Sequence, residues 1–158
     1  IARGTLVSTD ALVNEALDRN RLAAEAKSIV LQAQVHYSGE LYADPELLGT
    51  ALHNLVENAV RYSPEKTRVD LLIEREGDTL NISVTDQGAG IPEEEQARIF
   101  ERFYRVDAAR SRQTGGTGLG LSIVKHVMGQ HGGQVSVQSV PGQGSTFTLS
   151  LPIADTAV

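Results

Sequence analysis

A strand that ends in an acidic residue and two glycines constrains this chain most. Residues 80–84 alternate between apolar and polar side chains, which is the period of a half-buried strand. Asp86 follows this strand, and Gly88 and Gly90 come directly after it. An acid held at a strand end can accept a hydrogen bond from an exocyclic amine, and glycines let the backbone approach a flat ligand. A plain turn has the same pattern, so the rest of the chain must decide.

Composition excludes several classes of protein. The chain has 158 residues, which is enough for one domain with its own core. Its net charge of -6 argues against extended binding to nucleic acid. The absence of cysteine excludes disulfides and thiolate metal sites. The charge therefore leads us to expect no nucleic-acid partner. Since no apolar run is long enough to cross a bilayer, we also expect no membrane contact by this domain.

The first third of the chain predicts a helix followed by short strands. A helix capped by Thr9 or Asp10 is expected to run to about residue 26, and residues 1–8 carry little signal. Residues 28–35 and 39–42 are typical of short strands. The last residues, 154–158, are expected to fray.

A second helix is predicted to run from residues 44–46 to about Tyr62. Its start signal is strong, because Asp can cap the helix and Pro suits the first turn. Asn54, Asn58 and Arg61 recur at helical spacing beside an apolar stripe. Asn is a mediocre helix former, so propensity does not explain this pair. The polar stripe is either a solvent-facing surface or the wall of a ligand site, where an Asn oxygen would suit Mg²⁺.

Two hairpins and a glycine-rich helix start complete the pattern. Residues 69–74 and 80–84 predict one antiparallel hairpin, and residues 135–137 and 147–151 predict another. Between them lies a polar stretch, residues 104–117, whose arginines suit phosphate capture. Residues 115–121 then open a helix whose N-terminus is typical of an anion site. The stretch lacks the Gly-Lys-Ser/Thr ending of a Walker A loop.

These features together describe a pocket for a purine nucleoside triphosphate. At this point the chain resembles the catalytic ATP-binding domain of bacterial sensor histidine kinases, within the wider group of gyrase, MutL and heat-shock chaperone ATPases. The matching segments are the N box at 53–62, the glycine boxes at 86–90, 116–121 and 142–147, and the F box at 99–103.

The resemblance implies ATP and Mg²⁺ as cofactors and gives residues their roles. Asp86 would bind the adenine amine, and Asn58 would coordinate Mg²⁺ with Asn54 close by. Glu57 is a candidate to orient or deprotonate the acceptor histidine, so Asn54, Glu57 and Asn58 form the expected catalytic set. The other residues expected around the nucleotide are Arg61, Tyr62, Gly88, Gly90, Ile91, Tyr104, Arg105, Arg110, Gly116, Thr117, Gly118, Leu119, Gly120, Leu121 and Thr146.

The resemblance also implies an α/β fold, a two-layer sandwich of the Bergerat type with a mixed sheet and helices on one face. Residues 1–26 would be a helical lead-in from a dimerisation and phosphoacceptor region that is missing here. Residues 27–153 would form the catalytic ATP-binding domain, and residues 154–158 a frayed tail.

The implied activity is transfer of the γ-phosphoryl group of ATP to a histidine on that separate dimerisation domain. None of the chain's own histidines lies in a phosphoacceptor motif, so no autophosphorylation is expected in isolation. The domain would act in two-component signalling as a monomeric fragment of the cytoplasmic portion of a membrane sensor, reaching a response regulator only indirectly. The alternatives are a serine kinase of the anti-sigma-factor type and a nucleotide-binding regulatory module without catalysis.

Overall fold

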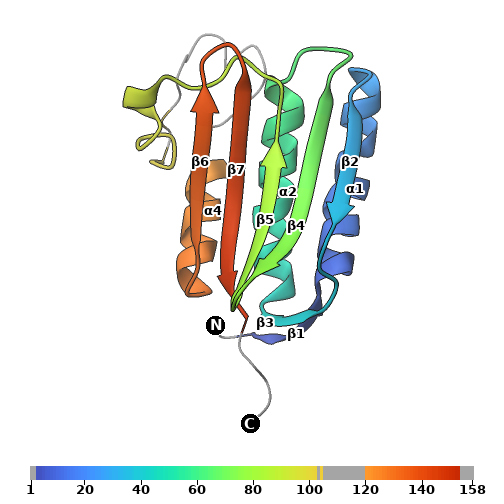
Figure 1. Ribbon diagram of the computed structural model, residues 1–158, viewed down its shortest axis with the longest axis vertical. Helices are drawn as coiled ribbons and strands as arrows, with labels where there is room; N and C mark the ends of the chain where they lie inside the picture. Colours follow the sequence, from blue (N-terminus) through green and yellow to red (C-terminus); the bar gives the residue numbers. More distant parts are fainter. Residues whose placement is uncertain (1–2, 103, 105–119, 154–158) are drawn as a thin grey trace.

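The computed structural model describes residues 3–102, 104 and 120–153. The main body of these described residues has two layers, a five-stranded sheet and three helices that lie together on one of its faces (Figure 1). The strand order is β2-β4-β5-β7-β6; β2 and β4 are parallel and the other pairs are antiparallel. This confirms the expected mixed sheet. The strands are β2 (Val30–Val35), β4 (Arg68–Glu76), β5 (Thr79–Thr85), β6 (Gln134–Val140) and β7 (Gly144–Pro152).

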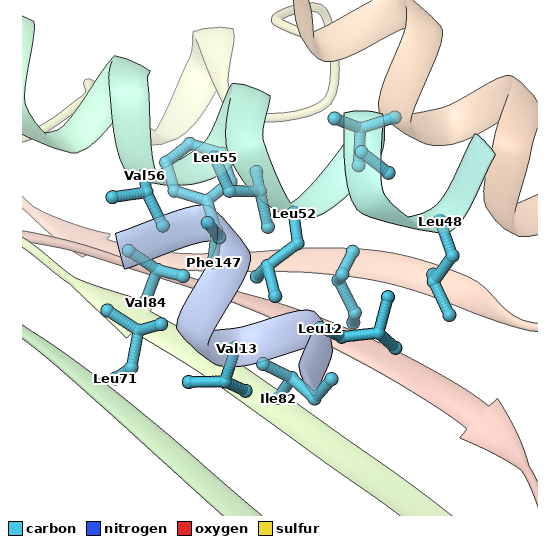
Figure 2. Close-up of a cluster of buried hydrophobic side chains, with 14 of the residues drawn as sticks. Leu12, Val13, Leu48, Leu52, Leu55, Val56, Leu71, Ile82, Val84 and Phe147 are labelled. Carbon is cyan, nitrogen blue, oxygen red and sulfur yellow. The ribbon is translucent and has the colours of Figure 1, made fainter. Parts of the chain in front are cut away.

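The core lies between the sheet and the helices α1 (Thr9–Ala26), α2 (Pro45–Tyr62) and α4 (Gly120–Gln130). Alternate residues of β4, β5 and β7 point into it, as the period of two requires. The central helix α2 presents a continuous apolar stripe to them, and Asp44 caps its first turn as expected. Figure 2 shows this contact, which comprises Leu48, Leu52, Leu55 and Val56 on α2 and Leu71, Ile82, Val84 and Phe147 on the sheet.

Helix α1 packs into the same core, because its Leu12 and Val13 are buried with the side chains of α2. The cap of α1 is Ser8, whose side-chain oxygen accepts a hydrogen bond from the Ala11 amide at 3.2 Å. Our expectation of Thr9 or Asp10 at this position was therefore wrong by one or two residues. The lead-in role of residues 1–26 stays a prediction.

Two short segments differ from the sequence-based expectation. Strand β1 (Thr5–Ser8) pairs with β3 (Glu40–Ala43) in a separate two-stranded sheet that residues 1–8 did not predict. Pro92 followed by three glutamates is typical of a helix start, but the chain makes only a single 3-10 turn there, η1 (Glu93–Glu95). So short a helix gains little from local hydrogen bonds. The Gln96 side chain, which donates to two backbone carbonyls, holds this segment instead.

None of the helices in the described part of the chain is long and apolar enough to cross a membrane.

We predict that Leu52→Ala lowers the free energy of unfolding by about 2 to 5 kcal/mol, because it leaves a cavity between the layers. Leu52 is 0% exposed. The matched control is Leu22→Ala, which shortens a leucine that is 82% exposed on α1. It should change stability by less than about 0.5 kcal/mol. Chemical denaturation measures the free energy of unfolding of both variants. Equal losses of stability would contradict the burial of Leu52 between the layers.

Candidate functional site

Asp86 lies directly after β5 and is buried at the end of the sheet. Its Oδ1 accepts hydrogen bonds from the backbone amides of Gly88, at 2.9 Å, and Ser145, at 3.1 Å. The Asp86 amide in turn donates to the Ser145 carbonyl at 2.8 Å. These bonds fix the orientation of the carboxyl group. Its other oxygen, Oδ2, makes no hydrogen bond to the described residues and is the atom left for a ligand.

The electrostatics of this carboxyl group favour a ligand with an N–H donor. Burial raises the pKa of Asp86, because an ionised carboxylate loses its hydration there. The hydrogen bonds from Gly88 and Ser145 lower the pKa but only partly compensate. A donor placed against Oδ2 would supply a further hydrogen bond to the charged form. An exocyclic amine of a flat ring is such a donor.

The glycines of this region bring backbone segments together around Asp86. A Cβ on Gly88 would lie 2.7 Å from the carbonyl oxygen of Tyr62, at the end of α2. Gly144, at the start of β7, has a φ of +103°, and a Cβ there would lie 2.2 Å from the Asp86 carbonyl oxygen. We read Gly88 and Gly90 from the sequence as room for a ligand. In the structure they also give room to the protein's own backbone, since a Cβ on Gly90 would lie 2.4 Å from the Val140 carbonyl oxygen.

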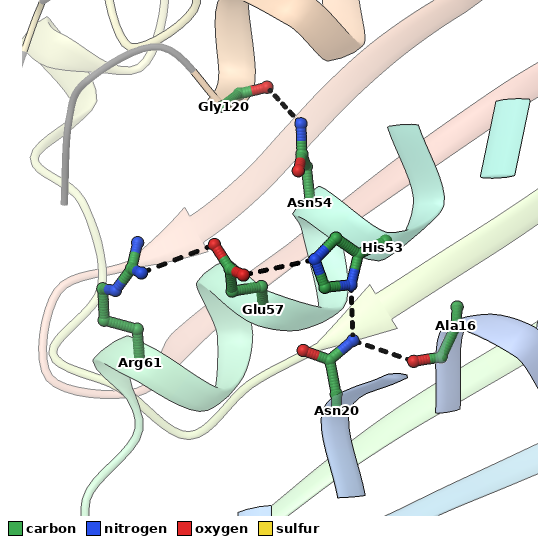
Figure 3. A network of polar contacts seen from close by, with 7 residues as sticks. All are labelled: Ala16, Asn20, His53, Asn54, Glu57, Arg61 and Gly120. Carbon is green, nitrogen blue, oxygen red and sulfur yellow. Dashed lines mark hydrogen bonds and ion pairs between the residues drawn. The ribbon is translucent and has the colours of Figure 1, made fainter. Parts of the chain in front are cut away.

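On the polar stripe of α2, the Asn54 side chain points toward the start of α4 (Figure 3). Asn54 is half-buried, and its Nδ2 donates to the Gly120 carbonyl at the start of α4, at 3.4 Å. Asn58 is half-buried too, and its amide makes no hydrogen bond to the described residues. Arg61 donates to Glu57 at 3.4 Å. Asn54 thus contacts a neighbouring helix, and all three residues of the stripe are partly buried, so the stripe is not a fully solvated surface.

These side chains could bind Mg²⁺ only together with ligands from outside the protein. No group of three or more His, Asp or Glu side chains in the described part of the chain could hold a metal ion by itself. The Asn58 oxygen is a hard ligand, and Mg²⁺ usually takes one or two protein ligands, several waters and phosphate oxygens. Asn58 thus fits a metal that arrives with a phosphorylated ligand.

The end of α2 has an anchor that sequence reasoning missed. Lys27 follows α1, and its ammonium group donates to the carbonyls of Val60, at 2.9 Å, and Arg61, at 3.0 Å. These are carbonyls of the last turn, which lack partners within the helix. Burial lowers the pKa of Lys27, and Glu65 opposes this shift. Nothing in the local sequence signals a contact between residues 33 positions apart.

The structure also describes four other residues expected at the site, which lie on α4 and around η1. Gly120 begins α4 and Leu121 follows it, half-buried against the core. The Ile91 amide donates to Ser139 Oγ at 2.7 Å. The Tyr104 hydroxyl donates to Glu95, and the Arg98 guanidinium lies 4.6 Å from the centre of the Tyr104 ring. Tyr104 is thus tied to the segment around η1.

Thr146 differs from the expectation. Its hydroxyl bonds to that of Thr85 at 2.9 Å, and both residues alternate with the buried pair Val84 and Phe147. Because successive side chains of a strand point to opposite faces, the Thr146 hydroxyl lies on the sheet face away from the helices. The structure therefore does not bring it to the Asp86 carboxyl group. The remaining expected residues lie outside the described part of the chain: Arg105, Arg110, Gly116, Thr117, Gly118 and Leu119.

We predict that Gly144→Ala destabilises the fold more than Gly142→Ala. Both glycines have positive φ, so each alanine costs about 1 to 2 kcal/mol of backbone strain. Only the alanine at 144 also meets backbone, whereas a Cβ at 142 has nothing within 4 Å. Thermal and urea unfolding of the two variants test this, and equal destabilisation would show that the close approach at Asp86 is not needed.

The chain matches a known protein family and known proteins. Residues 43–155 match the family described as histidine kinase-, DNA gyrase B- and HSP90-like ATPase. The chain is 49% identical over 146 residues to the sensor-like histidine kinase SenX3 of Mycolicibacterium smegmatis, a match that covers 92% of this chain and 38% of that protein. The chain thus spans less than half the length of this curated relative.

Two solved structures show the same fold. The mycobacterial sensor histidine kinase MprB has a TM-score of 0.82 and 30% identity, with 94% of this chain and 97% of that chain covered. The catalytic domain of the histidine kinase ThkA has a TM-score of 0.84 and 26% identity, with 95% of each chain covered. From the family match over most of its length, this chain belongs to the histidine kinase-, DNA gyrase B- and HSP90-like ATPases.

Proposed function

We propose that this chain binds ATP with Mg²⁺ and transfers its γ-phosphoryl group to a histidine on a separate dimerisation domain. The observation that carries the proposal is the fixed carboxyl group of Asp86, whose Oδ2 is left for an amine beside the end of α2. The names of the relatives favour histidine over serine as the acceptor, because they are sensor histidine kinases.

Each element of the site would hold a different part of the nucleotide. Asp86 would accept a hydrogen bond from the adenine amine. Asn58 would give its oxygen to Mg²⁺, which neutralises phosphate charge when bound. Arg61 would face the phosphates, together with the N-terminus of α4, where free amides and the helix dipole favour anions.

Phosphoryl transfer then depends mainly on position and charge neutralisation. A nitrogen of the acceptor imidazole would attack the γ-phosphorus, the bond to the β–γ bridging oxygen would break, and ADP would leave. The imidazole would lose its N–H proton, and Glu57 is our candidate to orient or accept it. We expect slow hydrolysis of ATP, because the Asn54 amide cannot take a proton from water as a carboxylate would.

The partners and location follow from the same proposal. The acceptor histidine would belong to the dimerisation domain of the same kinase, and a response regulator would receive the phosphoryl group from it. This chain would be the catalytic part of a sensor's cytoplasmic portion. We expect no autophosphorylation by the chain alone.

We predict that Asp86→Asn weakens binding of a non-hydrolysable ATP analogue by at least about tenfold, because one good hydrogen bond to a charged group contributes about 1.5 to 3 kcal/mol. The fold should survive, since the Asn oxygen can still accept from Gly88 and Ser145. Because burial raises the pKa of Asp86, a neutral amide also avoids the cost of a desolvated charge. Calorimetry with and without Mg²⁺ measures binding, and thermal unfolding measures the fold.

The matched control is Asp78→Asn, in the turn at the opposite end of β5, where the side chain is 85% exposed. This variant should bind as the unmodified chain does. Unchanged affinity in Asp86→Asn would overturn the assignment of Asp86, and no nucleotide binding by the unmodified chain would overturn the proposed function.

A further inference from the structure

A line of polar contacts runs from the buried face of α1 to Arg61 at the end of α2 (Figure 3). We propose that His53 is a positioning residue for Arg61, on which it acts through Glu57, and that Asn20 sets the tautomer of His53. The inference rests on the proposed function, because it takes Arg61 to be the arginine that faces the nucleotide's phosphates. It adds residues to the site that neither the resemblance nor the comparisons assign.

The orientation of the Asn20 amide is fixed by the backbone of its own helix. Asn20 is 2% exposed, and its Nδ2 donates to the Ala16 carbonyl at 2.8 Å. A carbonyl can only accept, so the amide nitrogen and not the oxygen must lie there. The same Nδ2 lies 3.0 Å from Nδ1 of His53.

This contact fixes the tautomer of His53. Because the Asn20 nitrogen can only donate, Nδ1 of His53 must accept and carries no proton. The neutral ring therefore has its proton on Nε2, which lies 3.2 Å from Oε2 of Glu57. Burial and the charge of Arg19 lower the pKa of His53, while Glu57 and Glu15 oppose the shift. The neutral ring thus agrees with its surroundings and acts as a donor to Glu57.

Glu57 passes this constraint on to Arg61. Its Oε1 accepts from a terminal nitrogen of the Arg61 guanidinium at 3.4 Å, while Oε2 accepts from His53. The three residues recur every four positions on α2 and so stack along one side of the helix. Glu57 is held between two donors, and this leaves the carboxylate little freedom to release the arginine.

A held arginine binds phosphate at a lower entropic cost. A long side chain loses rotamer freedom when a ligand immobilises it, and part of that loss is already paid where the side chain is pre-organised. Glu57 engages one terminal nitrogen of Arg61, and the other guanidinium donors have no partner among the described residues. Those donors remain for a phosphate.

The competing explanation is that His53 merely ties α1 to α2. Two variants separate the explanations, because the Asn oxygen lies near the place of the histidine's Nδ1 and the Gln nitrogen near that of Nε2. His53→Asn keeps an acceptor for Asn20 and loses the donor to Glu57. His53→Gln keeps the donor to Glu57 and loses the acceptor for Asn20.

The experiment measures, by calorimetry on the full chain, the affinity for adenosine, for ADP and for a non-hydrolysable ATP analogue with Mg²⁺. We expect His53→Asn to weaken binding of both phosphorylated nucleotides by about two- to fivefold, the size typical of a partly exposed ion pair. Adenosine should bind all variants equally. His53→Gln should bind every ligand as the unmodified chain does.

Two further variants keep the test decisive. Glu57→Gln, at a side chain that is 43% exposed, should show the same selective loss even if His53→Asn fails to fold. In an Arg61→Ala background His53→Asn should cause no additional loss, because the residue through which it acts is gone.

Several results would overturn the inference while the proposed function stands. The first is normal nucleotide affinity in His53→Asn or Glu57→Gln. The second is a loss of affinity in His53→Gln as large as that in His53→Asn, or a loss for adenosine as large as that for the nucleotides. The third is a further loss of affinity when His53→Asn is added to Arg61→Ala. Failure of the unmodified chain to bind the ATP analogue would instead overturn the proposed function.

Discussion

The buried carboxyl group of Asp86 is the constraint on which the rest of the site depends. Burial disfavours its charge, yet two backbone amides fix one of its oxygens at the end of β5. To bring those amides there, three backbone segments must approach closely, and Gly88 and Gly144 permit this. The glycines of the first and third glycine boxes therefore contribute to the fold as well as to a ligand contact.

Helix α2 connects this point to the core. One side of it packs into the sheet through leucine and valine, and another carries the polar stripe, whose Asn54 contacts the start of α4. Its C-terminal end is held by Lys27, and its exposed side by the contacts of Glu57 and His53. Since both groups of contacts reach back to α1 and the residue after it, the first helix stabilises the geometry of the site.

Much of this structure could be predicted from the sequence, because the signals are local. Alternation identified β4, β5, β6 and β7, and Asp44 with Pro45 located the start of α2. That Asp86, Asn54 and Asn58 belong to one site stays a prediction from the motifs. The cap of α1 was misplaced by one or two residues, as boundaries often are, and the signal after Pro92 gave only a 3-10 turn.

The rest could not be predicted because it depends on contacts between residues far apart in the chain. Nothing near Lys27 or Asn20 indicates that each meets α2, 33 positions later in the sequence. The pairing of β1 with β3 has no turn signal, since α1 and β2 lie between them. Thr146 was placed at the site by its motif alone, and the pleat of β7 turns its hydroxyl to the other face.

The most direct test of this account is calorimetry, under identical conditions, of an adenine nucleotide and of the inosine nucleotide with the same phosphates, in which a 6-oxo group replaces the exocyclic amine. If Asp86 Oδ2 accepts a hydrogen bond from the exocyclic amine, the 6-oxo ring places an acceptor against an acceptor. Its affinity should then be lower by at least about tenfold. Equal affinities would contradict the account, because they would show that Asp86 does not recognise the amine.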